Sequence, residues 1–319
     1  MPRSNVESPL STTAFGSRAR RPRLTTSRLR WAALALILCP LACIGPDAQA
    51  AGKPLKVFIS NDMEGLTGVF ENREVSHGNP EYGYPYFREV LTRDTNAAIE
   101  GAFAAGATEV LVREGHGGMN HMILEMLDKR VRVVRGPTDP QSMMVMMEGF
   151  DSSFDAVVLI GYHASAGTPN AVLPHTMGEA IVYFKINGVP LSEASYNGLI
   201  AGQYDVPIVM LSGDRAACEE AKRTFGPEIE TVAVKEALSG GIITLHPGVA
   251  REMIRKAVER GVRNRAKIKP YKIAGPYTAT LRQKKVTPLI PGAYVDEQGD
   301  IEFRTPDLMK ALDALVQMW

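Results

Sequence analysis

Apolar segments of strand length alternate with helical patterns through most of this chain, and no other feature restricts the fold as strongly. The expected strands cover residues 55–60, 109–113, 131–134, 156–160, 206–211 and 231–234. Helical patterns cover residues 86–105, 214–225 and 247–265. Strands that alternate with helices are typical of βαβ units, which build parallel sheets covered by helices. The sequence therefore predicts an α/β fold with a mainly parallel sheet and helices on both faces.

Two regions depart from this alternation. Asn187-Gly188 lies between apolar flanks within residues 182–190, and this dipeptide favours a tight β-hairpin. After about residue 267 the chain becomes rich in lysine and proline, with strand-like segments at 277–282 and 301–304 and a final helix from Pro306. We therefore expect a main α/β domain over residues 51–266 and a small α+β portion over residues 267–319.

The first fifty residues have the pattern of a secretory signal peptide. Six arginines between positions 18 and 30 precede an apolar run over residues 31–44, and the small-residue site Ala48-Gln49-Ala50 follows. The apolar run is too short to span a bilayer as a helix. We expect cleavage before Ala51, export to the periplasm or the exterior, and no membrane association of the mature protein.

Charge and cysteine content narrow the possible partners and the source of stability. Without the first fifty residues, 29 basic and 33 acidic residues remain, so the mature chain carries a small negative charge. This balance gives no electrostatic footprint for nucleic acid. Only Cys218 remains of the three cysteines, which excludes an internal disulfide. The mature chain therefore depends on its hydrophobic core.

Acidic and histidine side chains follow three of the expected strands. Asp62 and Glu64 come directly after the first strand, His116 follows the second, and His163 follows the strand that begins at residue 156. Residues two apart in a strand point the same way, and two converging carboxylates repel unless a cation or a proton neutralises them. Ligands of open α/β sheets bind at the carboxyl ends of the strands. This distribution predicts a cation site at that edge.

Two more residues are candidates for the same site, with alternatives left open. Glu193 opens a helix just beyond the hairpin, where it is either a capping acid or a fifth ligand. His175 is a candidate acid/base, because histidine exchanges protons near neutral pH, or else a surface loop residue. Singly, Asp62 could be a turn residue and His163 a satisfied core histidine. Their coincidence at several strand ends favours the site.

The other conspicuous residues have structural explanations. His77 and His121 are expected in loops, and His246 precedes Pro247 at the start of a helix. The methionine-rich run over residues 143–147 offers soft metal ligands but is more typical of packing. The glycines of residues 115–118 lack the spacing of a dinucleotide-binding loop.

An ordered set of motifs resembles the DppA-type D-aminopeptidase family of zinc metallopeptidases. The resemblance extends from about Leu55 to Pro247 and is weaker towards the end of the chain. The motifs are Asp62-Met63-Glu64-Gly65, Gly115-His116 with Met119-Asn120, Glu148-Gly149, Gly161-Tyr162-His163-Ala164, Thr168-Pro169, His175-Thr176-Met177, Ile186-Asn187-Gly188, Glu193, Asn197, Tyr204-Asp205-Val206-Pro207 and Gly213-Asp214.

The resemblance implies a site, an activity and an assembly. Asp62 would bridge two zinc ions, with Glu64 and His163 completing one and His116 and Glu193 the other. His175 matches the family's catalytic histidine. The resemblance also implies a homodecameric ring that admits short peptides and removes N-terminal D-amino acids.

The chemical types of these candidate ligands also suit a hydrolase with two divalent cations. Three carboxylates and two imidazoles without a thiolate accept zinc, and also manganese or cobalt. Two such cations can hold a bridging hydroxide at neutral pH, which would be the nucleophile.

Two other classes of function would use the same residues. An exported peptide- or metal-binding protein would use the same cleft without turnover, but a binder has no need of an acid/base histidine. An amidase or a phosphoesterase could use a related dinuclear site. Against the phosphoesterase, no basic clamp lies near the motifs apart from Arg113.

Overall fold

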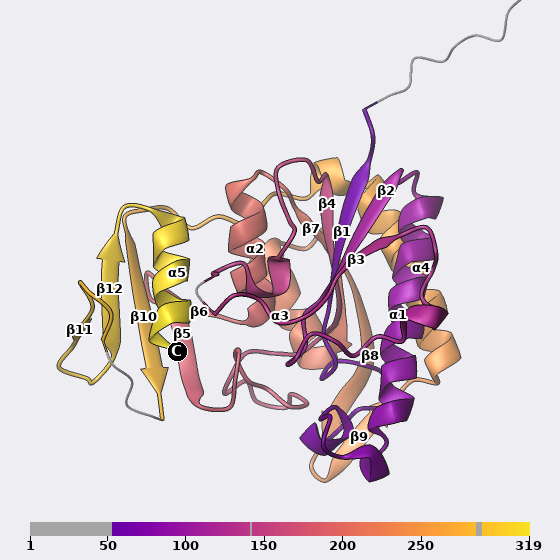
Figure 1. Cartoon of the computed structure of the whole chain (residues 1–319), viewed down its shortest axis with the longest axis horizontal. Helices are drawn as coiled ribbons and strands as arrows, with labels where there is room; N and C mark the ends of the chain where they lie inside the picture. Colours follow the sequence, from indigo (N-terminus) through magenta and orange to yellow (C-terminus); the bar gives the residue numbers. More distant parts are fainter. Residues whose placement is uncertain (1–52, 141, 285–288) are drawn as a thin grey trace, which may run out of the picture. The chain divides into compact units, whose positions relative to one another are not determined.

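The larger sheet has seven strands in the order β3-β2-β1-β4-β7-β8-β9 (Figure 1). The computed structural model describes residues 53–140, 142–284 and 289–319. The six strands from β3 to β8 in this order pair in parallel, and β9 runs antiparallel to β8. The prediction of a mainly parallel sheet is therefore confirmed. The strands are β1 (Lys56–Asn61), β2 (Glu109–Glu114), β3 (Arg132–Val134), β4 (Ala156–Tyr162), β7 (Ile208–Asp214), β8 (Glu230–Leu238) and β9 (Gly241–Thr244).

Helices cover both faces of this sheet, as predicted (Figure 1). On one face lie α1 (Tyr84–Ala104) and α4 (Pro247–Arg263), and on the other lie α2 (Glu193–Gln203) and α3 (Arg215–Phe225). Alternation along β1 explains the two layers, since successive side chains of a strand point to opposite faces. Val57 and Ile59 belong to the core cluster of α1 and α4, whereas Phe58 belongs to the cluster of α2 and α3.

A second, antiparallel sheet has the order β11-β12-β10-β5-β6. Its hairpin turns at Asn187 and Gly188, which both have positive φ, so the predicted hairpin is confirmed. Strands β10, β11 and β12 of this sheet follow the expected boundary after residue 266. The hairpin strands β5 and β6 precede that boundary and come from the middle of the chain. The elements are β5 (Ile181–Ile186), β6 (Val189–Leu191), β10 (Tyr277–Gln283), β11 (Tyr294–Val295), β12 (Ile301–Thr305) and α5 (Leu308–Met318).

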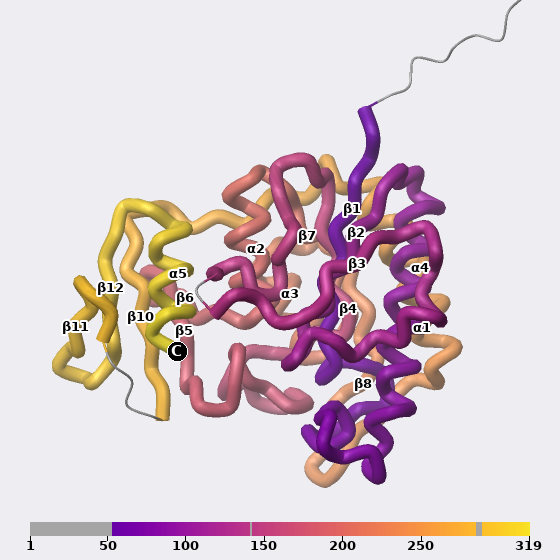
Figure 2. Tube along the Cα trace, in the orientation of Figure 1, coloured from indigo at the N-terminus to yellow at the C-terminus, as the bar shows by residue number. Residues whose placement is uncertain are grey.

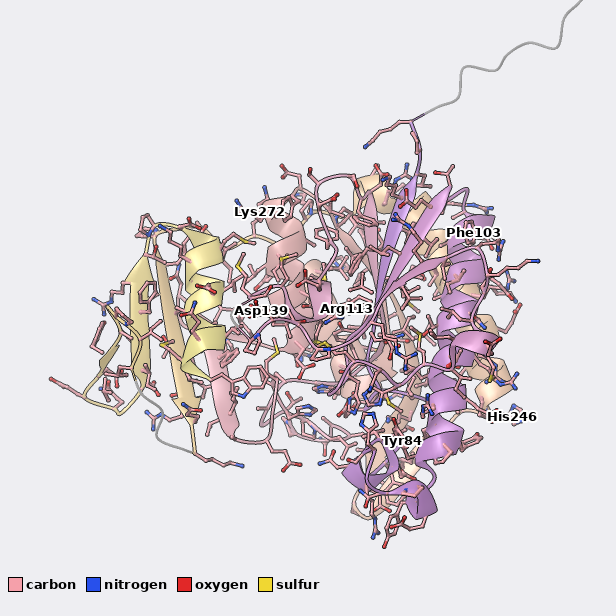
Figure 3. The ribbon with its side chains drawn as sticks, viewed as in Figure 1. Tyr84, Phe103, Arg113, Asp139, His246 and Lys272 are labelled. Atoms are coloured by element: carbon pink, nitrogen blue, oxygen red, sulfur yellow. The ribbon has the colours of Figure 1, made fainter. Side chains whose placement is uncertain are left out.

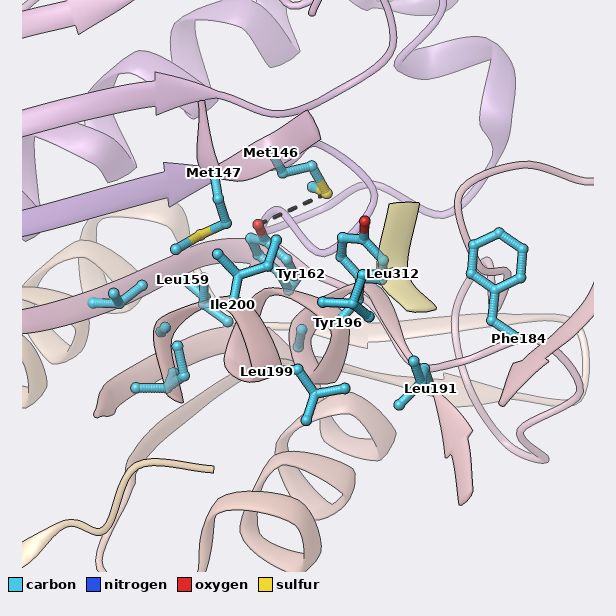
Figure 4. Close-up of a cluster of buried hydrophobic side chains, with 14 of the residues drawn as sticks. Met146, Met147, Leu159, Tyr162, Phe184, Leu191, Tyr196, Leu199, Ile200 and Leu312 are labelled. Atoms are coloured by element: carbon cyan, nitrogen blue, oxygen red, sulfur yellow. Dashed lines mark hydrogen bonds between the residues drawn. The ribbon is translucent and has the colours of Figure 1, made fainter. Parts of the chain in front are cut away.

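The α2 face of the large sheet and the small sheet share one hydrophobic core. Helix α5 packs on β10 and β12, and the tube view shows β5, β10 and α5 side by side (Figure 2). Leu312 of α5 belongs to the same buried cluster as Tyr196 of α2 and Tyr162 of β4 (Figure 4). The two sheets are thus held together by apolar burial.

Short 3-10 helices lie in the connections. They are η1 (Asn72–Glu74), η2 (Pro80–Tyr82), η3 (Leu124–Met126), η4 (Val145–Met147) and η5 (Arg265–Lys267). The predicted signal peptide lies outside the described residues. In the described part of the chain, no helix has the length and apolar character needed to cross a bilayer.

Candidate metal centre

The acids and histidines predicted from strand ends converge at one edge of the large sheet. Asp62 and Glu64 follow β1, His116 follows β2, and His163 follows β4. These strands are neighbours in the order β2-β1-β4, and all three run parallel. Their carboxyl ends therefore deliver the four side chains to the same place.

Asp62 lies between two histidines. Its Oδ1 is 3.1 Å from His116 Nδ1, and its Oδ2 is 3.3 Å from His163 Nε2. Glu64 adds an oxygen 2.9 Å from His116 Nδ1, and Glu193 adds one 3.4 Å from His163 Nε2. The five predicted metal ligands thus form one cluster, and all but His116 are buried.

His175 joins this cluster from the loop between β4 and β5. Its Nε2 lies 3.6 Å from Glu193 Oε1, and its ring stacks on His163 with centroids 3.9 Å apart. Donor atoms of Asp62, Glu64 and His163 lie within 4.8 Å of one another, as do those of His163, His175 and Glu193. The first group is the ligand set predicted for one of the two metal ions. The second contains His175, so the pairing of His116 with Glu193 stays a prediction.

Each of the three histidines directs its second ring nitrogen to a backbone carbonyl. His116 Nε2 is 3.1 Å from Val75 O, His163 Nδ1 is 3.1 Å from Ala164 O, and His175 Nδ1 is 2.9 Å from Leu173 O. A carbonyl accepts only, so this nitrogen carries the proton. Metal-ligating histidines are oriented in this way, with the lone pair of the other nitrogen left for the ion.

The charges of the cluster shift the pKa of its members strongly. Burial alone would lower the pKa of His116 and His163, but the neighbouring carboxylates hold both well above the usual range. Burial alone would raise the pKa of Asp62 and Glu193, yet the adjacent histidines hold both low. Three carboxylates in a buried place thus require positive charge, which protons or a divalent cation can supply.

The donor atoms fit a divalent metal. Asp62 Oδ2 and His163 Nε2 are buried, and neither makes a hydrogen bond although they lie 3.3 Å apart. Buried polar atoms without hydrogen bonds are rare, and an ion is one explanation for them. Carboxylate and imidazole donors match zinc coordination.

Two glycines let the loop after β1 lie directly against the end of β4. Gly65 N donates a hydrogen bond to Gly161 O at 2.7 Å, and a Cβ at Gly65 would lie 1.9 Å from Tyr162 O. Gly161 has φ +73°, and a Cβ there would lie 2.2 Å from Asp62 O. This close approach brings Asp62 to His163.

Lys235 is a supporting residue that the sequence analysis missed. It is 3% exposed on β8, and its Nζ donates to the carbonyl oxygens of Glu64 and Val69, the latter at 2.6 Å. Burial lowers the pKa of Lys235 to about 7. The lysine thereby fixes both ends of the loop that carries Glu64. The sequence did contain a signal for this residue, since Lys235 directly follows the apolar strand segment 231–234.

Glu114 supports His116 in a similar way. Its Oε2 accepts hydrogen bonds from the backbone N–H groups of His121 and Met122, the second at 3.1 Å. These bonds close the loop on which His116 lies. Burial raises the pKa of Glu114.

The remaining histidines lie outside the cluster of candidate ligands. Tyr84, labelled in Figure 3, places its hydroxyl 2.9 Å from His121 Nδ1, and burial lowers the pKa of His121 to about 3. His246 caps α4 by accepting a hydrogen bond from Gly248 N at 3.1 Å, so the predicted helix start is confirmed.

Two cavities adjoin the cluster. One, of about 550 Å³, is lined among others by Asn72, Glu179 and Lys284. The other, of about 350 Å³, reaches towards Met119 and Trp319. Glu64, His116 and His175 line both cavities. A bound chain could therefore pass the donor atoms and reach into both.

Comparison with known proteins decides the family. The family model described as D-aminopeptidase matches residues 55–316. The chain belongs to the D-aminopeptidase family. The predicted family and the predicted enzyme class, a metallo-aminopeptidase of the D-aminopeptidase type, are thereby confirmed.

Individual D-aminopeptidases agree with this assignment. The D-aminopeptidase of Bacillus subtilis (strain 168) is 32% identical over 271 residues, which cover 83% of this chain and 96% of that protein. A solved structure, described as the Zn-dependent D-aminopeptidase DppA from Bacillus subtilis, a self-compartmentalizing protease, is similar with a TM-score of 0.78 and 30% identity. That match covers 83% of this chain and 96% of the other, and it confirms the α/β fold.

Proposed function

We propose that this member of the D-aminopeptidase family is an exported dinuclear zinc aminopeptidase that removes N-terminal D-amino acids from short peptides. The position of Asp62 carries the proposal, since one carboxylate oxygen faces His116 and the other faces His163. A carboxylate with an imidazole on each side is suited to hold two cations at once. The zinc dependence of the similar Bacillus subtilis enzyme supports zinc as the metal.

The remaining ligands divide between the two ions in this proposal. Glu64 and His163 would hold one zinc together with Asp62, and His116 and Glu193 would hold the other. Manganese or cobalt would also be accepted by these donors. When bound, zinc supplies a water of lowered pKa and polarises the scissile carbonyl.

His175 moves the proton in this reaction. Its Nδ1–H donates to Leu173 O at 2.9 Å, which leaves Nε2 directed to the cluster. Nε2 takes a proton from the attacking water as the C–O bond forms. The same proton then goes to the leaving amine as the C–N bond breaks. Transfer by a positioned group is worth about 10²- to 10⁴-fold in rate.

Assembly and export complete the proposal. The similar enzyme is described as self-compartmentalizing, which supports a homo-oligomer, and we propose a homodecameric ring that admits short peptides. Residues 1–50 would direct export to the periplasm or the exterior and be removed there.

The decisive assay offers zinc-loaded protein D-Ala-D-Ala, L-Ala-L-Ala and a phosphate ester. Hydrolysis of the D-dipeptide supports the proposal. No hydrolysis would indicate a binding protein, and turnover of the ester alone would indicate a phosphoesterase.

Two variants separate metal binding from proton transfer. His175→Ala should retain zinc and lose about 10²- to 10⁴-fold in kcat. Asp62→Ala should lose zinc by elemental analysis. His246→Ala is a matched control, because His246 caps α4 and should leave both quantities unchanged. Normal turnover in His175→Ala, or full zinc in Asp62→Ala, contradicts the assigned roles.

A further inference from the structure

The smaller cavity beside the candidate metal centre has two unlike walls. One wall consists of candidate ligands, and the other is apolar. The cavity volume of about 350 Å³ is at the lower end of small-molecule sites, which measure about 300–1,000 Å³. The apolar wall consists of Met119, Val145, Met146, Met177 and Trp319.

Three residues of this apolar wall have left-handed backbone. Met119 has φ 54°, Val145 has φ 39° and Met177 has φ 61°. For a β-branched residue such as Val145 this conformation is an outlier. Such backbone persists only where its surroundings hold it, and it gathers at ligand-binding places. The wall therefore holds costly backbone conformations of the kind found at ligand-binding places.

Arg113 holds two parts of the wall together. It is 1% exposed, its Nε donates to Val145 O at 3.2 Å, and its Nη2 donates to Met119 Sδ. Thr138 Oγ1 donates to the same Val145 carbonyl at 2.9 Å. A buried charge committed to these contacts fixes the left-handed turn at Val145.

The rest of the wall is also fixed. Ser60 Oγ donates to Met146 O at 2.9 Å, and Tyr162 OH lies 3.9 Å from Met146 Sδ, the contact drawn in Figure 4. Met177 N donates to Glu193 Oε1 at 2.6 Å. The cavity is thus preorganised, which reduces the entropic cost of binding a ligand.

Trp319 closes the cavity from the small sheet. It follows α5, and its ring lies beside Gly178, where a Cβ would come within 3.5 Å of the ring. Trp319 is 43% exposed, so this residue presents apolar surface that a ligand could cover.

We propose that this cavity is the subsite for the side chain of the substrate's N-terminal residue, and that it selects apolar side chains of methionine or phenylalanine size. The inference rests on the proposed aminopeptidase function. A chain that ends at the N-terminal residue suits the smaller, more enclosed cavity, and the continuing peptide suits the larger one with Lys284. The carboxylates of the opposite wall are committed to zinc in the proposed function, and methionine, valine and tryptophan offer a charged side chain no partner in exchange for its lost hydration.

The first test compares tripeptides that differ only in the N-terminal residue. Zinc-loaded enzyme receives D-Xaa-Gly-Gly with Xaa as alanine, methionine, phenylalanine, aspartate or lysine. Because a methylene in an apolar pocket is worth about 10- to 200-fold, kcat/KM for D-Met should exceed that for D-Ala at least about tenfold. The aspartate and lysine substrates should be poorer than D-Ala.

A substitution in the wall should change this preference. Val145→Phe places a ring in the cavity, so the D-Met to D-Ala ratio should fall by about tenfold or more. Val249→Phe is the matched control, because Val249 is 51% exposed on α4 and does not line the cavity. Met177→Ala enlarges the cavity and should shift the preference from D-Met towards D-Phe.

A second measurement does not depend on turnover. The sequence contains two tryptophans, Trp31 and Trp319, so full-length Trp31→Phe has Trp319 as its single tryptophan. Titration with free D-methionine should change its fluorescence with an apparent Kd at least about tenfold below that for D-alanine. Val145→Phe in the same background should abolish this difference.

The outcomes separate the two proposals. A D-Met to D-Ala ratio near one, or a ratio that Val145→Phe leaves unchanged, overturns the subsite while hydrolysis of D-tripeptides still supports the aminopeptidase. Equal fluorescence responses to D-methionine and D-alanine also overturn the subsite. Absence of any D-tripeptide hydrolysis overturns the aminopeptidase and this inference with it.

Discussion

Replacement of Gly65 by alanine should disable the site without touching a candidate ligand. Gly65 lies in the loop between Asp62 and Thr67 and packs against the end of β4. A Cβ at this position would lie 1.9 Å from Tyr162 O and 2.6 Å from Gly161 O. Both obstacles are backbone atoms of a buried central strand, so they cannot move aside as a side chain would.

The size of the effect follows from the clash. An ordinary carbon–oxygen contact is about 3.3 Å, so the loop must retreat by roughly 1.4 Å. It would also lose the hydrogen bond from Gly65 N to Gly161 O. Misplacement of reacting groups by about 1 Å costs about 10²-fold. We therefore expect kcat/KM to fall by about 10²-fold, which corresponds to roughly 3 kcal/mol.

The assay measures kcat/KM for D-Ala-D-Ala together with zinc affinity in metal buffers. Zinc affinity should fall by about 10- to 100-fold, as it does when the support of metal ligands is removed. Circular dichroism checks that the variant is folded. Gly78→Ala is the matched control, because Gly78 has no positive φ and a Cβ there meets nothing within 4 Å. A folded Gly65→Ala enzyme with normal activity and zinc affinity would refute the reasoning.

Two further predictions concern buried charges. Burial, opposed by Arg251 at 3.8 Å, raises the pKa of Asp94 to about 7, so the folded state keeps a proton that the unfolded state loses near pH 4. The free energy of unfolding of the wild type should therefore fall between about pH 4 and pH 7. Relative to the wild type, that of Asp94→Asn should rise by roughly 4 kcal/mol across this window. Urea unfolding at pH 4.5 and pH 8 measures the difference between the two proteins, and the same difference at both pH values contradicts the prediction. Lys235→Met leaves the buried carbonyls of Glu64 and Val69 without a donor, at about 1–3 kcal/mol each. The Tm of Lys235→Met should fall by several degrees, and its zinc affinity should weaken. If thermal scans and zinc titration show that neither quantity changes, Lys235 does not fix the loop.

The central parallel strands β4 and β7 were predictable because each is a run of buried, mainly apolar residues. Strand β4, for example, is buried along its whole length, so its sequence needs no alternation to be recognised. The strands that were missed lack this signal. Strand β9 is four residues long at the sheet edge with Ile243 53% exposed, and β11 has two residues.

The candidate ligands were predictable for a topological reason, and their supports were not. Parallel strands send their carboxyl ends to one edge, so acids and histidines after such strands meet regardless of their separation in sequence. Lys235 contacts the carbonyl of Glu64 across 171 residues of sequence. That contact depends on the order β1-β4-β7-β8, which no local pattern encodes. Trp319 likewise reaches the site only because α5 packs on the small sheet.

The small sheet is a part of the site. Glu193 lies at the first position of α2, two residues after β6 ends, and Ser192 caps the helix by accepting a hydrogen bond from Ser195 N at 3.2 Å. The hairpin β5–β6 thus determines where Glu193 meets His163, and the same sheet supports α5 and Trp319. Because β5 pairs with β10, a change that loosens this pairing should move a candidate ligand and the cavity wall together. If the last fifty residues only stabilised the fold, such a change would leave Glu193 and the cavity wall in place.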